Sequence, residues 1–242
     1  MIGNQHFLSK VRRSLQSQRP LKSLANSVAA ALLLFCLAPL LGQKGGSPTP
    51  ASHPQLKSGD IVFQDSEVDA QGHKHSGQAG PIKELTKSDW SHMGIYFEKP
   101  GGAVVVEAIG TAHKEIPWSE WRGHGAGENY AVRRLKGGLD APAVKALYEA
   151  ATKYAGQPYD FKFAWSDDEI YCSELVWKAF RDACHKEVGQ VQRLGDFALS
   201  SKAGKKLIER PVSWGSIKKV PLDEEVVSPQ AILLSPELAE VK

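Results

Sequence analysis

The segment that most constrains the fold runs from Tyr171 to Cys184, YCSELVWKAFRDAC. Its apolar residues recur at helical spacing along one side, which predicts an amphipathic helix that packs against another layer. This apolar stripe comprises Leu175, Val176, Ala179, Phe180 and Ala183. Cys172 opens the stripe in the first turn, so its thiol is expected to point toward that other layer.

Apolar runs typical of strands predict that the other layer is a sheet. These runs are Ser58–Gln64, Ser91–Glu98, Ala103–Gly110 and Asn129–Leu135. Pro100 and Gly101 separate the second run from the third and suit the two central positions of a type II turn. The two runs are therefore expected to form an antiparallel hairpin.

The turn also predicts which side chains meet across that hairpin. If Lys99 opposes Gly102, then His92 lies opposite Ile109, and Glu107 is the diagonal neighbour of His92 on the same face. A slip of one residue would place His92 and Glu107 on opposite faces. Their contact thus depends on the register.

Three further helices are predicted. One spans Asp140–Ala155, with Asp140 as its cap and Gly156 as its stop. A short helix is expected within residues 79–90, and another near 201–209. Between the first two strands, residues 65–78 lack apolar periodicity and predict a surface loop.

That loop contains two histidines, His73 and His75. Zinc sites in proteins are usually completed by Cys or carboxylate ligands at short spacing. Because no such pattern lies nearby, no metal site and no cofactor are expected.

The N-terminus has the pattern of an export segment. Five basic residues precede an apolar run, Val28–Leu41, and a polar stretch follows it. A membrane span needs about 20 apolar residues, so a signal sequence cut after Gly42 is favoured over an uncleaved anchor or a buried helix. A lipoprotein modified at Cys36 is disfavoured by the bulky Phe35. The basic residues are Lys10, Arg12, Arg13, Arg19 and Lys22.

Composition fits one core-forming domain. The chain has 242 residues, 42% of them hydrophobic, with 3 Cys, which excludes intrinsic disorder and a disulfide scaffold. We expect a signal peptide or anchor at 1–42, a linker at 43–56 and one domain at 57–242. Removing 1–42 leaves 25 basic against 27 acidic residues, a charge of −2 instead of +3. A nucleic-acid partner is therefore not expected.

The two remaining cysteines are not expected to pair. Cys172 and Cys184 are 12 residues apart on the predicted helix, about 18 Å along its axis, which is too far for a disulfide. The helix N-terminus favours the thiolate form of Cys172 through its dipole and free N–H groups. Cys184 lies at the opposite end, so Cys172 is the candidate functional thiol.

A thiolate nucleophile needs an imidazole and a group that orients it. His92 and Glu107 can supply both, and Glu174 is the alternative acceptor if the hairpin register differs. The patterns alone also allow a structural interpretation, in which Cys172 is a small core residue, His92 is structural and Glu107 faces water.

The order of the motifs resembles that of a known family. SGDIVFQ, SHMGIYF, VVEA, PYDFKF and YCSELVWKAF follow one another between about Ser58 and Leu234. This order is similar to that of the circularly permuted NlpC/P60 papain-like hydrolases of the YiiX/YebB type. In unpermuted NlpC/P60 enzymes the cysteine helix precedes the histidine strand, whereas here Cys172 follows His92.

The resemblance implies an α+β papain-like fold, with the cysteine helix packed against an antiparallel sheet or small barrel. It implies that Cys172 is the nucleophile, His92 the general base and acid, and Glu107 the residue that orients the imidazole. Asp60 of SGDIVF matches the family pattern and is expected to cap a turn near the site.

The mechanism that follows is acyl transfer through a thioester. The backbone N–H of Cys172 or Ser173 is placed to stabilise the oxyanion, although Ser173 can instead act as a helix cap. Nearby aromatic residues, Tyr159 and Tyr171 among them, either line a substrate groove or pack in the core.

Three functions remain open. The first is an exported, periplasmic cysteine amidase or peptidase that cleaves peptide or acyl-amide bonds, with cell-wall peptides as the nearest substrate. The second is a lipid-directed thiol acyltransferase or esterase, and the third is a non-catalytic binding module, against which the intact Cys172, His92 and Glu107 argue. Membrane contact is expected only through the N-terminal segment.

Overall fold

The computed structural model describes residues 54–66, 77–110, 112–126, 129–154 and 157–242. The expected export segment, most of the linker, His73, His75 and Gly156 lie outside these residues. Within the described ranges, no helix has the length and apolar character needed to cross a membrane.

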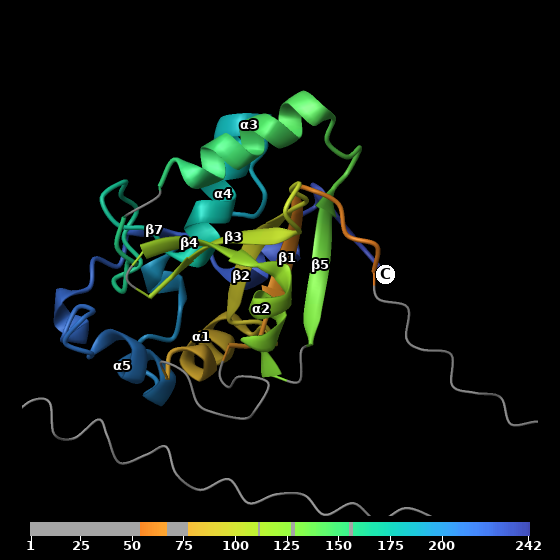
Figure 1. Cartoon of the computed structure of the whole chain (residues 1–242). Coiled ribbons are helices and arrows are strands. Elements are labelled where there is room, and N and C mark those ends of the chain that lie inside the picture. Colours follow the sequence, from red (N-terminus) through yellow and green to blue (C-terminus); the bar gives the residue numbers. More distant parts are fainter. Residues whose placement is uncertain (1–53, 67–76, 111, 127–128, 155–156) are drawn as a thin grey trace, which may run out of the picture. The chain divides into compact units, whose positions relative to one another are not determined.

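A six-stranded antiparallel sheet organises the domain (Figure 1). Its order is β4–β3–β2–β1–β5–β8, so among the described residues β4 and β8 are the edge strands and the sheet is not closed into a barrel. The strands are β1 (Asp60–Gln64), β2 (His92–Phe97), β3 (Val104–Ile109), β4 (Ala112–Pro117), β5 (Tyr130–Leu135) and β8 (Leu238–Glu240). The four predicted strands are confirmed, and β4 and β8 were not predicted. A separate two-stranded sheet pairs β6 (Gln192–Arg193) with β7 (Glu225–Val226).

The helices follow the predicted pattern with additions. They are α1 (Ala79–Thr86), α2 (Trp118–Gly123), α3 (Ala141–Thr152), α4 (Cys172–Cys184), α5 (Lys202–Ile208) and α6 (Pro229–Leu233), with 3-10 turns η2 (Leu194–Asp196) and η3 (Ile217–Lys219). The cap predicted for α3 is confirmed, since the Asp140 carboxylate accepts a hydrogen bond from the Ala143 N–H at 2.9 Å. Neither α2 nor α6 was predicted.

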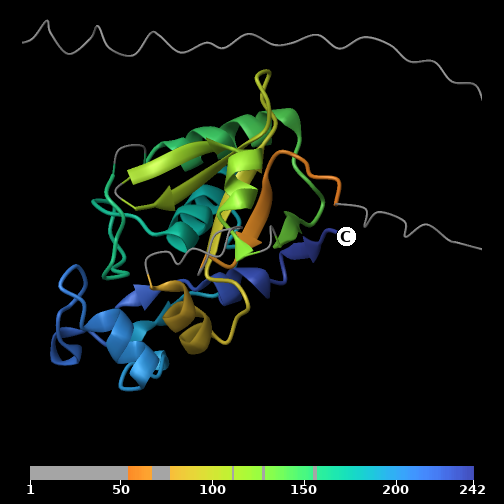
Figure 2. The ribbon, with the colours of Figure 1, turned by 60° about the horizontal axis from the view of Figure 1, so that its bottom comes forward.

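Helices cover both faces of the sheet. The apolar stripe of α4 packs on β2 and β3 in the larger core, with α3 against its outer side. On the opposite face, Trp121 of α2 packs with Val62, Val105 and Val132 in a second core. Away from the sheet, α1 and α5 lie side by side (Figures 1 and 2).

The β2–β3 hairpin has the predicted register but not the predicted turn. Ile95 pairs with Val106, and the Gly102 N–H donates to the Lys99 carbonyl at 3.0 Å, so Lys99 opposes Gly102 as expected. A type II turn would require positive φ at Gly101. The positive φ is found instead at Gly102, at 119°, so the type II prediction was wrong.

Gly94 of β2 lies against Val105, Val106 and Glu107 of β3, so a side chain added at Gly94 tests the packing that this register creates. A Cβ at this position would lie 2.5 Å from Val105 Cγ1, 2.8 Å from the Val106 carbonyl oxygen and 3.2 Å from Glu107 Cβ. We expect Gly94→Ala to lower the free energy of unfolding by about 1–3 kcal/mol because of this overpacking. Gly101→Ala in the same hairpin meets no atom within 4 Å, and should change it by less than about 0.5 kcal/mol. Urea unfolding of both variants measures the difference, and equal stabilities would contradict the packing at Gly94.

Candidate active site

Cys172 is the first residue of α4 and is 3% exposed. The Ser173 backbone N–H hydrogen-bonds to its sulfur, as expected at a helix N-terminus. Cys184 lies at the last turn of the same helix, and both thiols are free, as predicted.

His92 and Glu107 meet across the hairpin. His92 Nε2 and Glu107 Oε2 are 2.6 Å apart, and the two side chains are 5% and 0% exposed. This contact confirms the diagonal pairing predicted from the turn. Because His92 is the first residue of β2, its ring lies at the end of the strand and can contact both Glu107 and Cys172.

The Cys172 thiol hydrogen-bonds to the His92 ring. Burial alone would lower the pKa of His92, but the charges and hydrogen bonds of Glu107 and Cys172 raise it to about 10. Burial would raise the pKa of Cys172, yet the imidazolium of His92, the Tyr159 hydroxyl and the Ser173 N–H together lower it. Both shifts act in the same direction, because each favours the thiolate–imidazolium pair over the neutral thiol and imidazole.

Trp121 of α2 supports the acid from the opposite side. Its indole Nε1 donates to Glu107 Oε2 at 2.8 Å, the same oxygen that contacts His92, and the ring is fully buried. The sequence interpretation missed this residue. The Trp118–Trp121 spacing on one helical face was the available signal, but it does not indicate a carboxylate partner.

Tyr159 lies on the other side of the thiol. A parallel bridge pairs Tyr159 with Ile170, two residues before Cys172. The bridge is closed by Asp160 N–H to the Ile170 carbonyl at 3.2 Å, and by Ile170 N–H to the Pro158 carbonyl at 3.0 Å. The Tyr159 hydroxyl hydrogen-bonds to Cys172, and burial raises its own pKa well above the usual value. A protonated donor is therefore held beside the sulfur.

The side chains of Ser173 and Tyr171 fix the start of the helix. The Ser173 hydroxyl donates to the Val227 carbonyl at 2.8 Å, and the Val227 N–H donates to the Tyr171 hydroxyl at 3.1 Å. Ser173 is therefore not a helix cap, and its contribution at the thiol is its backbone N–H. Both residues nevertheless line the cavity described below.

Asp60 does not belong to the site. It begins β1, whereas Gln64 at the other end of β1 pairs with His92. Asp60 caps the turn from Lys57, whose N–H it accepts at 2.8 Å, and pairs with Arg134 at 2.6 Å. The expected capping role of Asp60 is confirmed. The prediction that Asp60 lies near the site was wrong, because the length of β1 separates Asp60 from the end of the strand that pairs with His92.

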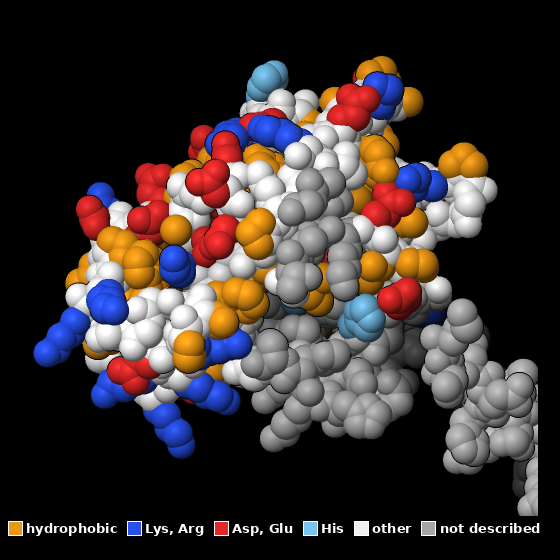
Figure 3. Space-filling view, turned by 60° about the vertical axis from the view of Figure 1, so that its left-hand side comes forward, with side chains coloured by type: hydrophobic (Ala, Val, Ile, Leu, Met, Phe, Trp, Pro, Cys, Tyr) orange, Lys and Arg blue, Asp and Glu red, His pale blue; other side chains and the backbone are white. Residues whose placement is uncertain are grey.

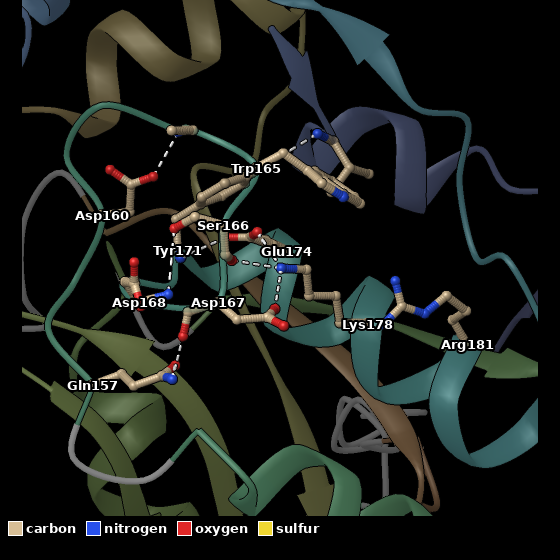
Figure 4. A network of polar contacts seen from close by, with 12 residues as sticks. Gln157, Asp160, Trp165, Ser166, Asp167, Asp168, Tyr171, Glu174, Lys178 and Arg181 are labelled. Atoms are coloured by element: carbon tan, nitrogen blue, oxygen red, sulfur yellow. Dashed lines mark hydrogen bonds and ion pairs between the residues drawn. The ribbon is translucent and has the colours of Figure 1, made fainter.

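Glu174 pairs with Lys178 of its own helix (Figure 4). Its carboxylate lies 2.8 Å from Lys178 Nζ, one turn further along α4, and both residues are buried. The same ammonium donates to the Ser166 carbonyl at 2.6 Å and to Asp167 at 2.7 Å. Glu107, and not the alternative Glu174, is thus the acceptor of His92.

Cys172 lines an apolar cavity of about 60 Å³ that is partly open to solvent. Its walls come from α1, α5, the η2 region and residues 227–229 at the start of α6. The lining includes Ile82, Leu85, Tyr159, Phe163, Leu199, Leu207, Ile208 and Val227.

A second cavity, more polar, lies on the His92 side. Ser91, Ile82 and Tyr159 line both cavities, whereas His92 lines only this one and Cys172 only the apolar one. Gln64 also lines it, and neither atom of its buried carboxamide has a hydrogen-bond partner in the described structure. Cys172 and His92 thus line two neighbouring cavities, of which the one at His92 is the more polar.

Known proteins resemble this chain over the same region. Residues 55–242, which include Cys172, His92 and Glu107, match the family model described as "Permuted papain-like amidase enzyme, YaeF/YiiX". The chain is 42% identical over 193 residues to the uncharacterized protein YiiX of Escherichia coli strain K12, covering 79% of this chain and 89% of that protein. A solved structure, described as metalloprotein yiiX from Escherichia coli O157:H7, matches with a TM-score of 0.68 and 39% identity. That match covers 77% of this chain and 96% of that chain.

The description of that relative as a metalloprotein has no counterpart in the described part of this chain. There, no group of three or more His, Cys, Asp or Glu side chains could hold a metal ion. His73 and His75 lie outside the described residues.

The different surroundings of the two thiols predict that Cys172 and Cys184 are alkylated at different rates. The pKa of Cys172 is lowered by His92, whereas burial raises that of Cys184. Iodoacetamide at pH 7.5 should therefore modify Cys172 faster, as measured by mass spectrometry of the cysteine peptides. In His92→Ala the pKa of Cys172 should rise, so its rate profile should move to higher pH. Equal, slow modification of both thiols in the unsubstituted chain would exclude the thiolate.

The Trp121–Glu107 hydrogen bond predicts a loss of stability in Trp121→Phe. The substitution keeps an apolar ring but removes one of two donors from a buried carboxylate, which costs about 1–3 kcal/mol. Trp118→Phe is the matched control, because Trp118 stacks on Trp121 at 5.5 Å without bonding Glu107. Urea unfolding at pH 7 compares the two, and a Trp121→Phe midpoint no lower than that of the control would argue against the bond.

Proposed function

Since the chain belongs to the YaeF/YiiX family of permuted papain-like amidases, we propose that it hydrolyses amides through a thioester at Cys172. The observation that carries this proposal is the unbroken line of contacts from Cys172 through His92 to Glu107. A nucleophile, a proton carrier and an orienting acid are the three parts that thiol hydrolysis needs.

The steps follow from the positions of these groups. The Cys172 thiolate attacks the amide carbon and forms a carbon–sulfur bond, while the carbonyl oxygen becomes an oxyanion. The Ser173 N–H and Tyr159 hydroxyl, both within reach of the sulfur, are the donors available to it. His92 then gives its proton to the leaving nitrogen as the carbon–nitrogen bond breaks. In the second half, His92 takes a proton from the water that attacks the thioester, and collapse of this intermediate releases the acid and the Cys172 thiolate, which restores the starting pair.

Glu107 keeps His92 in the orientation that this cycle requires. With Nε2 held by Glu107, the other ring nitrogen, Nδ1, is left to exchange protons with Cys172 and the leaving group. Burial of Glu107 and Trp121 keeps water away from this contact, which strengthens it.

The two cavities support an orientation for the substrate. The acyl part stays on sulfur after the first step, and the leaving amine departs toward His92. The apolar cavity beside Cys172 therefore suits an apolar acyl chain. The more polar cavity, with the unpaired Gln64 carboxamide in its wall, suits a polar amine. This favours an acyl amide over a cell-wall peptide, because hydrophilic peptide groups gain nothing from apolar walls. An ester with the same acyl chain is the second candidate, since it would form the same thioester.

Export of the enzyme is part of the proposal. The basic flank, the apolar run Val28–Leu41 and the polar stretch after it support a periplasmic location, free or anchored. N-terminal sequencing of the exported protein distinguishes a cleaved signal from an anchor.

The substrate proposal predicts a dependence on acyl-chain length. With N-acyl amides of one polar amine, kcat/KM should rise about fourfold per added methylene until the cavity is filled, since each buried methylene contributes about 0.8 kcal/mol. Release of the free amine measures the rate. Cys172→Ala should abolish turnover while its urea unfolding midpoint stays close to that of the unsubstituted chain. Persistent hydrolysis by that variant would overturn the mechanism, whereas a flat chain-length series would overturn only the substrate class.

A further inference from the structure

The segment from α5 to η3 carries a concentration of positive charge. Residues 202–219 contain six basic residues and one acidic residue, Glu209. Residues 43–242 hold 25 basic and 27 acidic residues, so outside this segment they number 19 and 26, a charge of −7. The basic residues, here called the basic patch, are Lys202, Lys205, Lys206, Arg210, Lys218 and Lys219, of which the five lysines are exposed.

Large apolar side chains are exposed beside this charge. Val212 is 52% exposed, and Leu222, which is followed by Asp223, Glu224 and Glu225, is 58% exposed. Elsewhere in the described chain Leu234 is 68% exposed, whereas most large apolar side chains are covered. In Figure 3, which brings forward the side of the molecule that carries α5, blue basic and orange apolar side chains gather together at the lower left. The face combines two kinds of group that water-soluble surfaces usually keep dispersed.

The segment is anchored against the domain. The Trp214 indole donates to the Lys162 carbonyl at 3.0 Å, and Lys162 Nζ lies 5.9 Å from the centre of the Trp214 ring. Lys162 is itself exposed and adds a further positive charge next to the patch. The charges are therefore presented from a packed scaffold.

The same segment forms a wall of the apolar cavity. Leu207 and Ile208 of α5 turn inward and line the cavity, together with Leu199 just before the helix. Lys202, Lys205 and Lys206 of the same helix are exposed. One short helix thus has the cavity on its inner side and the basic patch on its outer side.

From this arrangement we infer that the basic patch, with Val212 and Leu222, binds the surface of an anionic lipid bilayer. Lysines near such a surface are attracted to the headgroups, and aliphatic side chains gain by entering the interfacial region. A nucleic acid would also attract the lysines, but its phosphates offer nothing to Val212 and Leu222. An anionic bilayer accommodates both features, so under this inference the catalytic domain contacts the membrane in addition to the expected N-terminal contact.

Membrane binding at this face would shorten the path of an acyl chain from the bilayer to Cys172. That consequence rests on the proposed function, whereas the binding itself does not. The two are tested separately, because vesicle binding needs no turnover.

The test uses the full chain with Cys172→Ala as background, so that hydrolysis cannot alter the lipids. Co-sedimentation measures its partitioning onto vesicles of phosphatidylcholine and phosphatidylglycerol at 3:1, and onto pure phosphatidylcholine, in 0.1 M NaCl. The variant Lys202→Gln, Lys205→Gln, Lys206→Gln neutralises α5. A matched control, Lys136→Gln, Lys145→Gln, Lys186→Gln, removes the same charge from exposed lysines outside the patch. All chains keep residues 1–42, so that segment contributes equally.

The partition coefficient of the α5 variant onto the anionic vesicles should be lower than that of the control variant by roughly tenfold or more. Val212→Ser with Leu222→Ser should also weaken it, and 0.5 M NaCl should reduce the difference between the α5 and control variants. Equal partitioning of the α5 and control variants would overturn the inference. The inference would also be overturned if the α5 variant no longer bound a short DNA duplex but still bound the vesicles as the control variant does. Partitioning onto pure phosphatidylcholine that matches partitioning onto the anionic vesicles would overturn the role of charge.

Discussion

The contact between His92 and Glu107 is the constraint on which the rest of the site depends. Two groups that carry charge in a buried place are stable only when each has a partner. Glu107 has His92 and Trp121, and His92 has Glu107 and Cys172. Several otherwise unrelated features serve this contact: the absence of a side chain at Gly94, the hairpin register, and a helix that brings Trp121 to the far face of the sheet.

The part of this arrangement that is local in sequence could be predicted. His92 and Glu107 are joined by one hairpin, so the turn at Pro100 and Gly101 sets their register without help from the rest of the chain. The turn type was wrong because Gly102, not Gly101, takes the positive φ, yet the number of residues in the turn still gave the pairing. Cys172 was likewise predictable, because the start of an amphipathic helix is visible in its periodicity.

The parts that depend on distant contacts could not be predicted. The role of Trp121 depends on its hydrogen bond to Glu107, and that contact forms only when α2 packs on the sheet. Tyr159 was predicted to lie near Cys172, but the contact of its hydroxyl with the thiol depends on a bridge to Ile170, and no periodicity signals a single bridge. Asp60 shows the opposite error, since a motif match drew it toward the site while β1 carries it to the other end of the strand. The apolar cavity is built from segments that the chain brings together only after folding.

The buried pair Glu174–Lys178 on α4 links the proposed nucleophile, Cys172, to the Tyr159 hydroxyl beside it. Replacing such a pair by apolar residues is often neutral for stability, so its presence calls for another reason. Lys178, fixed by Glu174, donates to the Ser166 carbonyl and to Asp167, and so holds the loop that runs from Tyr159 to Ile170 against the helix. That loop places the Tyr159 hydroxyl at the sulfur of Cys172. One helix therefore supplies the thiol from its first residue and, one and a half turns later, anchors the loop that delivers the hydrogen-bond donor. In the proposed mechanism the distance between nucleophile and oxyanion donor is set by this helix and the loop fixed to it, which explains why a polar pair is kept where apolar side chains would pack.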